Sequence, residues 1–275
     1  MRYADTLRGQ FPGLDPEADD LFLLEAHQVA QLPDRAPDRE LAAVLHARPR
    51  LRRFLVARCP PIEEFLRRIA AEHGPVGPDE LAACEDELMW EIADWVVYQR
   101  APDRLDVEPD EAHDPCWTAI SDVAAGHGVD LHDQVVVDAG AGTGRLTFLA
   151  APTARHVFAV EPVAALRRHV RERAARQGIG NVFVLDGCLD QIPLPAATAD
   201  VLMTRQAIGW RLDAELREVE RVTKVDGLAI HLLGMPAPAP PGDELDPVLS
   251  AHGYRPGTYD ERGVVRRLYV RRFGR

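Results

Sequence analysis

The chain has 275 residues, of which 46% are hydrophobic and 28% charged, and this composition is typical of a globular protein with one or two domains. The formal net charge of −12 argues against nucleic acid as a partner, because such binding depends on Lys and Arg side chains that neutralise phosphates.

The cysteines and the apolar runs indicate in which cell compartment we expect the protein. The four cysteines lie far apart, without a Cys-x-x-Cys pair, so the sequence predicts neither a disulfide framework nor a metal site. Residues 1–10 lack the apolar core of a signal peptide, and no apolar run is long enough to span a bilayer. We therefore expect a cytoplasmic protein that does not associate with membranes.

The first part of the chain has a helical pattern. From residue 17 to about residue 127 the apolar residues recur at spacings of three and four, and Pro and Gly separate the segments. The longest helix is predicted to start at Pro78 and to run towards Tyr98. We expect an all-helical subdomain over residues 1–112, followed by a core over residues 113–275.

Aromatic residues and one histidine lie near this boundary. Tyr98 and Trp117 flank a Pro- and Asp-rich linker over residues 101–114, which is a candidate hinge or lid. Aromatic side chains with a polar edge suit a ligand-binding pocket, although packing in the core is the simpler alternative. His113 is a candidate general base, with an exposed residue at a helix start as the alternative.

A glycine-rich turn opens the core. Three consecutive valines from Val135 predict a strand buried on both faces, and Asp138 ends it. The turn that follows lacks Cβ atoms at alternate positions, so that backbone N–H groups can approach a ligand before a helix begins at Arg145. The candidate ligand-binding residues here are Asp138, Gly140, Ala141, Gly142 and Gly144.

The spacing of these glycines decides between two kinds of ligand. The dinucleotide fingerprint requires a third Gly or Ala three residues after its second Gly, where this chain has Arg145 or, in the next phase, Thr147. A nicotinamide cofactor is therefore disfavoured. Asp-x-Gly-x-Gly-x-Gly instead resembles the first motif of class I S-adenosylmethionine-dependent methyltransferases, whose loop wraps the methionine part of the cofactor.

Strands and helices then alternate, which predicts a parallel α/β sheet. A second buried strand over residues 156–160 ends in Glu161-Pro162, where a carboxylate can accept hydrogen bonds from both hydroxyls of a ribose. A third strand over residues 181–185 is followed by Asp186, Gly187 and Cys188. The resemblance implies that Asp186 accepts a hydrogen bond from the adenine amine, and an ordinary turn residue is the alternative.

The loop after the fourth strand is predicted to line the acceptor site. It follows residues 199–203 and contains Arg205, Gln206 and Trp210, at the strand end where open α/β sheets bind ligands. The family commonly has an aromatic-histidine pair here, so Arg205-Gln206 departs from its pattern and leaves the acceptor undefined.

The end of the chain completes the resemblance. A helix over residues 212–222 and a strand over residues 228–233 precede a helix over residues 244–252 and a predicted hairpin of residues 254–259 and 264–273. An antiparallel ending distinguishes the methyltransferase sheet from dinucleotide-binding sheets. We expect the arginines of the last strand to be exposed and to protect an edge, namely Arg266, Arg267, Arg271 and Arg272.

The sequence thus predicts a seven-stranded, mostly parallel Rossmann-like methyltransferase sheet with an antiparallel last strand, preceded by helices. The resemblance implies a methyltransferase that converts S-adenosylmethionine to S-adenosylhomocysteine and acts on a small molecule, as in secondary metabolism. A protein or peptide acceptor, or cofactor binding without methyl transfer, are the alternatives. The helical region is predicted to cover the cofactor and supply the acceptor pocket, or to form a homodimer interface.

Overall fold

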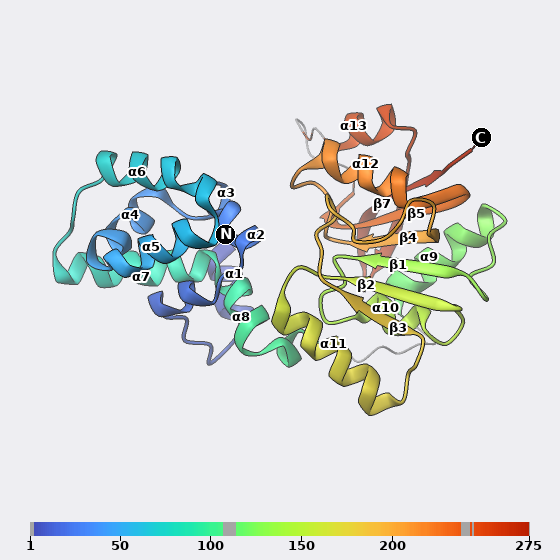
Figure 1. Ribbon diagram of the computed structural model, residues 1–275, viewed down its shortest axis with the longest axis horizontal. Helices are drawn as coiled ribbons and strands as arrows, with labels where there is room; N and C mark the ends of the chain where they lie inside the picture. The colour runs from blue at the N-terminus through green and yellow to red at the C-terminus, as the bar shows by residue number, and fades with distance from the viewer. Residues whose placement is uncertain (1–2, 107–113, 238–242, 244, 275) are drawn as a thin grey trace. The chain divides into compact units, whose positions relative to one another are not determined.

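The computed structural model describes residues 3–106, 114–237, 243 and 245–274 (Figure 1). They form two compact units, Met1–Leu105 and Asp106–Arg275. Among the helices of these described ranges, none combines the length and the apolar content that crossing a bilayer requires.

The first unit is entirely helical where it is described, which confirms the predicted helical region. Proline at the first or second helical position starts three of its described α-helices, α3, α5 and α7, since its missing N–H would be unpaired there in any case. The elements are α1 (Tyr3–Gln10), η1 (Ala18–Leu23), α2 (Ala26–Ala30), α3 (Leu32–Arg35), α4 (Asp38–Ala47), α5 (Pro49–Arg58), η2 (Pro60–Ile62), α6 (Glu63–Glu72), α7 (Pro78–Glu91), α8 (Ala93–Arg100) and η3 (Pro102–Leu105).

The predicted long helix from Pro78 towards Tyr98 is two helices. The chain leaves helical geometry at Ile92, where φ is −118° and ψ is 15°, and α8 begins at the next residue. Ile92 is fully buried in the core of the helical unit, so tertiary packing overrides the continuous apolar pattern.

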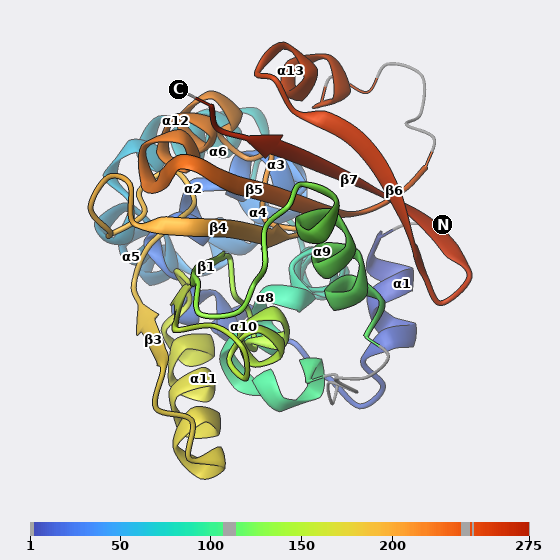
Figure 2. The same cartoon turned by 90° about the vertical axis from the view of Figure 1, so that its right-hand side faces the viewer.

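The second unit is built on a seven-stranded sheet in the order β3-β2-β1-β4-β5-β7-β6 (Figure 2). β1 to β5 run parallel, and β7 is antiparallel to both β5 and β6, which confirms the predicted sheet with an antiparallel last strand. The strands are β1 (Val135–Ala139), β2 (His156–Val160), β3 (Val182–Leu185), β4 (Ala199–Arg205), β5 (Thr223–Pro236), β6 (Arg255–Glu261) and β7 (Val264–Arg272).

Helices cover both faces of this sheet, and the alternation along β1 shows how. Val136 packs in the cluster with the helices α9 (Pro115–Gly126) and α10 (Arg145–Ala150), and Val137 packs in the opposite cluster with α12 (Leu212–Val222) and α13 (Leu245–Ala251). The helix α11 (Ala164–Gln177) contacts β3 on the side of α10. β1 is therefore buried on both faces, as its run of valines predicted.

Of the arginines of the last strand, Arg272 is exposed as predicted, but Arg267 is buried, Arg266 and Arg271 are half-buried, and the predicted position at an edge is wrong. β7 lies inside the sheet, between β5 and β6, so β6 forms the edge. Arg267 is buried and pairs with Asp243 at 2.8 Å and with Asp246 at 3.3 Å. Arg271 pairs with Glu220 at 3.3 Å. These side chains connect the sheet to neighbouring segments. The last strand of the sequence is not the edge strand, because the hairpin places β7 beside β5, and the order of strands along the chain does not reveal this.

Candidate active site

The glycine-rich turn between β1 and α10 has left-handed backbone geometry at all three glycines. The φ angles are 77° at Gly140, 57° at Gly142 and 88° at Gly144. A Cβ at Gly140 would overlap the Cβ of Ala207, and one at Gly144 would lie 2.7 Å from the Phe148 ring, so packing requires glycine at both positions. At Gly142 no heavy atom of the described residues lies within 4 Å of that point. The turn is open to a ligand at Gly142.

The backbone N–H groups of the turn are mostly used inside the protein. Those of Gly140 and Ala141 donate to the Val160 carbonyl at 2.8 and 3.1 Å, and that of Gly144 donates to the Ala141 carbonyl at 2.8 Å. Our expectation that these N–H groups face a ligand is therefore wrong for these positions. The bonds to Val160 instead fix the turn against the end of β2, so that it presents a rigid surface.

Asp138, near the end of β1, is buried beneath the glycine-rich turn's flanking elements, β1 and α10. Its side chain is 1% exposed, and its Oδ2 accepts a hydrogen bond from Thr147 Oγ1 at 2.6 Å, which ties the end of β1 to α10. Burial raises the pKa of Asp138 to about 6, because desolvation disfavours the charged carboxylate. Asp138 therefore stabilises the turn through its hydrogen bond with Thr147.

Glu161 and the glycine-rich turn meet, as the sequence predicted for parts of one site. The Glu161 side chain accepts the N–H of Gly142 with one oxygen and the N–H of Val163 with the other, both at 2.9 Å. The residue is 5% exposed, and burial raises its pKa to about 7. Each carboxylate oxygen has a second lone pair, so the group can still accept from a ribose hydroxyl.

Arg167 joins Glu161 to Asp186, a contact that the sequence analysis did not predict. Its guanidinium donates to the carbonyls of Glu161 and Pro162 at 2.8 and 2.6 Å and pairs with the Asp186 carboxylate at 2.9 Å. Arg167 is buried, whereas the Asp186 side chain is 72% exposed and can meet a ligand. Arg173 of the same helix is also buried.

Gly187 and Cys188 shape the backbone beyond Asp186. A Cβ at Gly187 would lie 2.6 Å from the Pro193 ring, so the chain needs glycine to fold back on itself here. The Cys188 carbonyl closes this turn by accepting the N–H of Gln191 at 3.0 Å. Burial raises the pKa of the Cys188 thiol to about 11, which keeps it neutral near pH 7.

The predicted acceptor residues beyond β4 lie on one strained loop. Gln206 is exposed and has a φ of 58°, which is uncommon for a residue with a side chain, and Trp210 is 48% exposed. Arg205 ends β4 and binds Glu261 of β6 at 2.8 Å. The loop lies against the glycine-rich turn through Ala207, so these residues border the same site.

Glu215 holds this loop, and the sequence analysis missed it. Its buried carboxylate accepts the N–H groups of Gly209, Trp210 and Arg211 at 2.7, 3.0 and 2.8 Å. The only sequence signal is an acid in the first turn of α12, which normally marks a helix start.

The other predicted acceptor residues are placed as follows. Trp117 is half-buried on α9 and packs against the core of the second unit. Tyr98 belongs to the helical unit and packs against that unit's core. His113 lies outside the described residues, so its role as a base stays a prediction.

Comparison with known proteins agrees with this geometry. Residues 136–227 match the model of the family described as "Methyltransferase domain". An uncharacterised methyltransferase of Geobacillus kaustophilus is 33% identical over 89 residues, which are 32% of this chain and 40% of that protein. The malonyl-[acyl-carrier protein] O-methyltransferase of Methylovorus sp. is 32% identical over 108 residues, with 36% of each chain covered. The chain spans about two fifths of the length of these curated relatives.

A solved structure is similar to the sheet unit. A SAM-dependent methyltransferase from Aquifex aeolicus is 22% identical, with 62% of this chain and 95% of that chain covered and a TM-score of 0.48. The antiparallel β7 of the seven-stranded sheet is the ending that the resemblance implied. The matched segment, residues 136–227, therefore carries the methyltransferase domain that the family model describes.

Proposed function

We propose that this chain transfers a methyl group from S-adenosylmethionine to a small-molecule acceptor, of the kind modified in secondary metabolism. The observation that supports this most is the junction of the glycine-rich turn with Glu161. An open surface at Gly142 lies beside a buried carboxylate with free lone pairs and a raised pKa, and a cationic ligand with a ribose would satisfy both.

The residues present fit such a cofactor. The turn from Gly140 to Gly144 would hold its methionine part, Glu161 its ribose and Asp186 its adenine. These side chains follow β1, β2 and β3, which are neighbours in the sheet, so the three parts of the ligand would lie side by side. The buried contacts of Arg167 keep the two acids in fixed positions.

The bound cofactor supplies an electrophilic methyl group on a sulfonium. The work left to the chain is to align the acceptor and to exclude water, and good alignment alone is worth effective molarities of roughly 10⁵ M or more. The strained loop after β4, held by Glu215, is rigid enough for such alignment. His113 remains our predicted base for an acceptor that must lose a proton.

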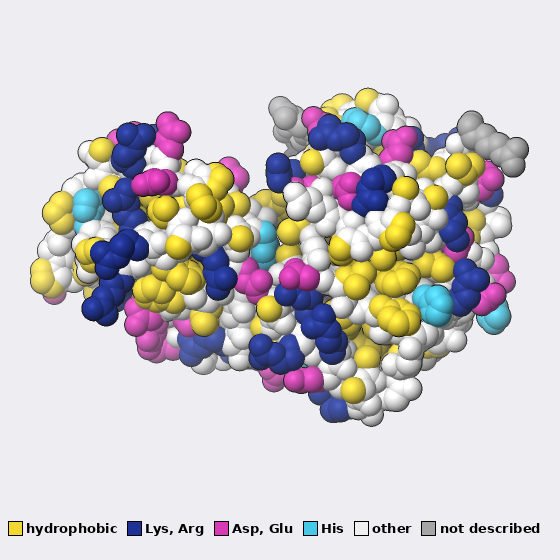
Figure 3. All heavy atoms as spheres, viewed as in Figure 1, with side chains coloured by type: hydrophobic (Ala, Val, Ile, Leu, Met, Phe, Trp, Pro, Cys, Tyr) yellow, Lys and Arg dark blue, Asp and Glu magenta, His cyan; other side chains and the backbone are white. Residues whose placement is uncertain are grey.

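Charge supports a small acceptor over a polyanion. The chain carries a net charge of −12, and on the face shown in Figure 3 acidic side chains lie among the basic ones. Binding to a nucleic acid depends on a surplus of basic side chains.

Calorimetry with the cofactor tests the proposal. Glu161→Ala should weaken S-adenosylmethionine binding by about 1–3 kcal/mol, which is the scale of hydrogen bonds to a charged group. Glu172→Ala, which removes an exposed acid from α11, is the matched control and should leave the affinity unchanged. Equal affinities for the two variants, with both folded by circular dichroism, would contradict the role of Glu161.

Turnover separates the proposal from its alternatives. Formation of S-adenosylhomocysteine together with a methylated product, in a panel of small molecules, is the expected result. Methylation of proteins or peptides alone would favour a macromolecular acceptor. Tight cofactor binding with no methylated product from either class would indicate a binding protein.

A further inference from the structure

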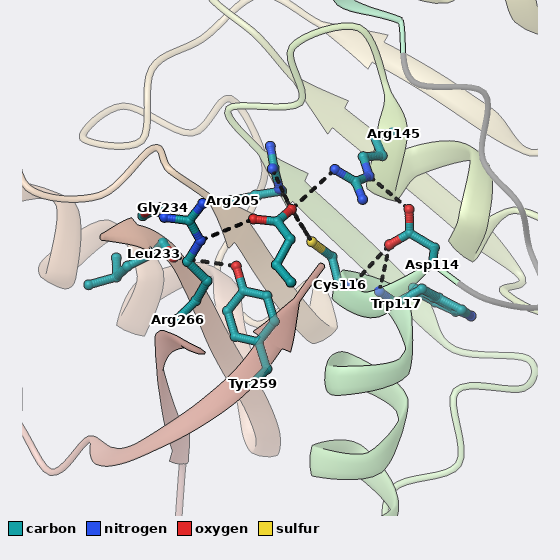
Figure 4. A network of polar contacts seen from close by, with 10 residues as sticks. Asp114, Cys116, Trp117, Arg145, Arg205, Leu233, Gly234, Tyr259 and Arg266 are labelled. Atoms are coloured by element: carbon teal, nitrogen blue, oxygen red, sulfur yellow. Dashed lines mark hydrogen bonds and ion pairs between the residues drawn. The ribbon is translucent and has the colours of Figure 1, made fainter. Parts of the chain in front are cut away.

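Three arginines converge on one carboxylate at the edge of the sheet where the parallel strands end (Figure 4). Glu261 Oε1 lies 2.8 Å from Arg205 Nη2 and 3.4 Å from Arg145 Nη1, and its Oε2 lies 3.4 Å from Arg266 Nε. We call Arg145, Arg205, Arg266, Glu261 and Asp114 the arginine cluster. It joins α9, α10, β4, β6 and β7, which are far apart in the sequence.

The arginine cluster carries one surplus positive charge. Asp114 accepts from Arg145 Nε at 2.8 Å and also caps α9, so the cluster has two carboxylates for three guanidinium groups. Arg205 holds the pKa of Glu261 below its usual value against the effect of burial, so Glu261 is ionised near pH 7. Burial raises the pKa of the neighbouring Cys116 thiol, which therefore adds no negative charge.

The surplus charge lies on the side that faces outward. The side chains of Asp114 and Glu261 are 3% and 11% exposed, whereas those of Arg205 and Arg266 are 26% and 25% exposed. Arg266 Nε is buried and makes no hydrogen bond to any acceptor in the described ranges, although Glu261 is 3.4 Å away. Because Nε is buried and Nη1 donates to the Gly234 carbonyl, an anionic ligand would meet the part of the Arg266 side chain that is exposed.

The position of the arginine cluster relates it to the proposed methyl transfer. Glu161 and Asp186 follow β2 and β3, on one side of β1, and Arg205 follows β4 on the other side. Arg145 directly follows Gly144, and Ala207, two residues after Arg205, contacts Gly140. The cluster therefore borders the glycine-rich turn from the half of the sheet that the cofactor's adenosine does not occupy.

We propose that the arginine cluster binds a carboxylate of the methyl acceptor, with Arg205 and Arg266 as its direct partners. This inference rests on the proposed methyltransferase function and narrows its substrate class to small carboxylic acids. Guanidinium groups present paired N–H donors that match a planar carboxylate. One surplus positive charge balances one carboxylate, whereas a phosphate dianion would leave the site negative.

Binding of small probes tests the assignment without knowledge of the acceptor. Acetate and benzoate, each compared with its neutral amide, and inorganic phosphate are titrated into the chain saturated with S-adenosylhomocysteine. We expect the carboxylates to bind at least about tenfold more tightly than acetamide and benzamide. Arg205→Gln and Arg266→Gln should each weaken benzoate binding by about ten- to a hundredfold, and Arg205→Lys by less, because it keeps the charge.

Arg271→Gln is the matched control. It makes the same charge change on β7, but Arg271 pairs with Ala229 in the sheet register, while Arg266 pairs with Pro236 at the other end of β5. Benzoate affinity should therefore be unchanged in this variant. Affinity for S-adenosylhomocysteine, measured in the same variants, shows that each is folded and tests the proposed function separately.

Several results would overturn the inference. Amides that bind as well as acids, or glutamine variants that bind benzoate as the unmodified chain does, would show that the arginines are only structural. Tighter binding of phosphate would reassign the anion. If benzoate binds only when S-adenosylhomocysteine is absent, and Arg205→Gln weakens both ligands, the arginines hold the carboxylate of the cofactor and not that of an acceptor.

Discussion

The two halves of the candidate site, on either side of β1, are built in different ways. In the half formed by β2 and β3, a buried acid is held by backbone N–H groups, as Glu161 is by Gly142 and Val163. In the half formed by β4, β6 and β7, side chains of the arginine cluster hold one another, as Arg205 and Arg266 hold Glu261, while Glu215 holds the adjoining loop through its backbone N–H groups. Backbone contacts fix one geometry for a constant ligand, whereas side-chain contacts can be changed residue by residue. The first half therefore suits the shared cofactor and the second suits a variable acceptor.

The largest effect is expected where the two halves touch, at Gly140. Gly140→Ala must hold a positive φ and must also displace Ala207, so we expect a loss of about 2–5 kcal/mol in the free energy of unfolding. Gly142→Ala keeps only the cost of the positive φ, about 1–2 kcal/mol. Thermal or urea unfolding of both variants measures this difference, and equal losses would show that the halves do not pack through Gly140.

For cofactor affinity, in contrast to stability, we expect the larger effect from Gly142→Ala and the smaller from Gly140→Ala. A methyl group at Gly142 projects into the open space at the turn, so Gly142→Ala should weaken S-adenosylmethionine binding more than it weakens the fold. Calorimetry that finds unchanged affinity in this variant would place the ligand elsewhere.

The next effect concerns the first half alone. Arg167→Met removes the donor to the carbonyls of Glu161 and Pro162 and frees Asp186, and should weaken S-adenosylmethionine binding by about ten- to a hundredfold. Benzoate binding to the arginine cluster should not change. Arg176→Met, on the exposed face of the same helix, is the control. Equal weakening of both ligands would show that the two halves do not act separately.

A smaller effect is expected in the second half from Glu215→Ala. Three backbone N–H groups of the loop after β4 lose their acceptor, which should cost about 1–3 kcal/mol in the free energy of unfolding. Turnover of an acceptor should fall while the affinity for S-adenosylmethionine stays within about twofold. Asp213→Ala, which removes an exposed acid from the same helix, should change neither quantity.

The smallest expected effect is a dependence of S-adenosylmethionine affinity on pH, through Glu161 of the first half. The pKa of Glu161 is raised to about 7 in the ligand-free chain, and a cationic ligand with ribose hydroxyls favours its ionised form. Affinity for S-adenosylmethionine should therefore rise by about tenfold from pH 6 to pH 8, with release of a proton on binding at the lower pH. Calorimetry in buffers of different ionisation enthalpy measures that proton.

The raised pKa of Glu161 makes the stability of the ligand-free chain change with pH in the opposite direction to its cofactor affinity. A buried acid that binds its proton more tightly when folded stabilises the ligand-free chain fully below about pH 4.5, and this contribution is lost as the pH rises towards 7. The ligand-free chain should thus lose stability over the range in which it gains affinity. A Glu161→Ala variant that keeps both trends would assign them to another group.

Local patterns explain what could be predicted from the sequence. The buried run from Val135, the glycines after it and the acid after residues 156–160 each depend on neighbours in the chain, and the structure has β1, α10 and β2 at the predicted residues. The break between α7 and α8 at Ile92 depends on packing between helices, which an apolar periodicity does not encode.

Long-range contacts explain what could not be predicted. Cys116 and Glu261 are 145 residues apart, and Arg167 reads as one more exposed arginine on a helix until the ends of β2 and β3 are placed beside it. Arg266 was expected to protect an edge because its strand comes last in the sequence, although it is paired on both sides in the sheet. In the arginine cluster, the ion pairs of Arg145 and Arg205 are such contacts.

A crystal structure of the chain with S-adenosylhomocysteine tests the central claim most directly. We expect both ribose hydroxyls within hydrogen-bonding distance of the Glu161 carboxylate, the amino-acid part against the turn at Gly142, and the sulfur facing the half that contains Arg205. A ligand bound away from the end of β2, with Glu161 still bonded only to Gly142 and Val163, would contradict the account.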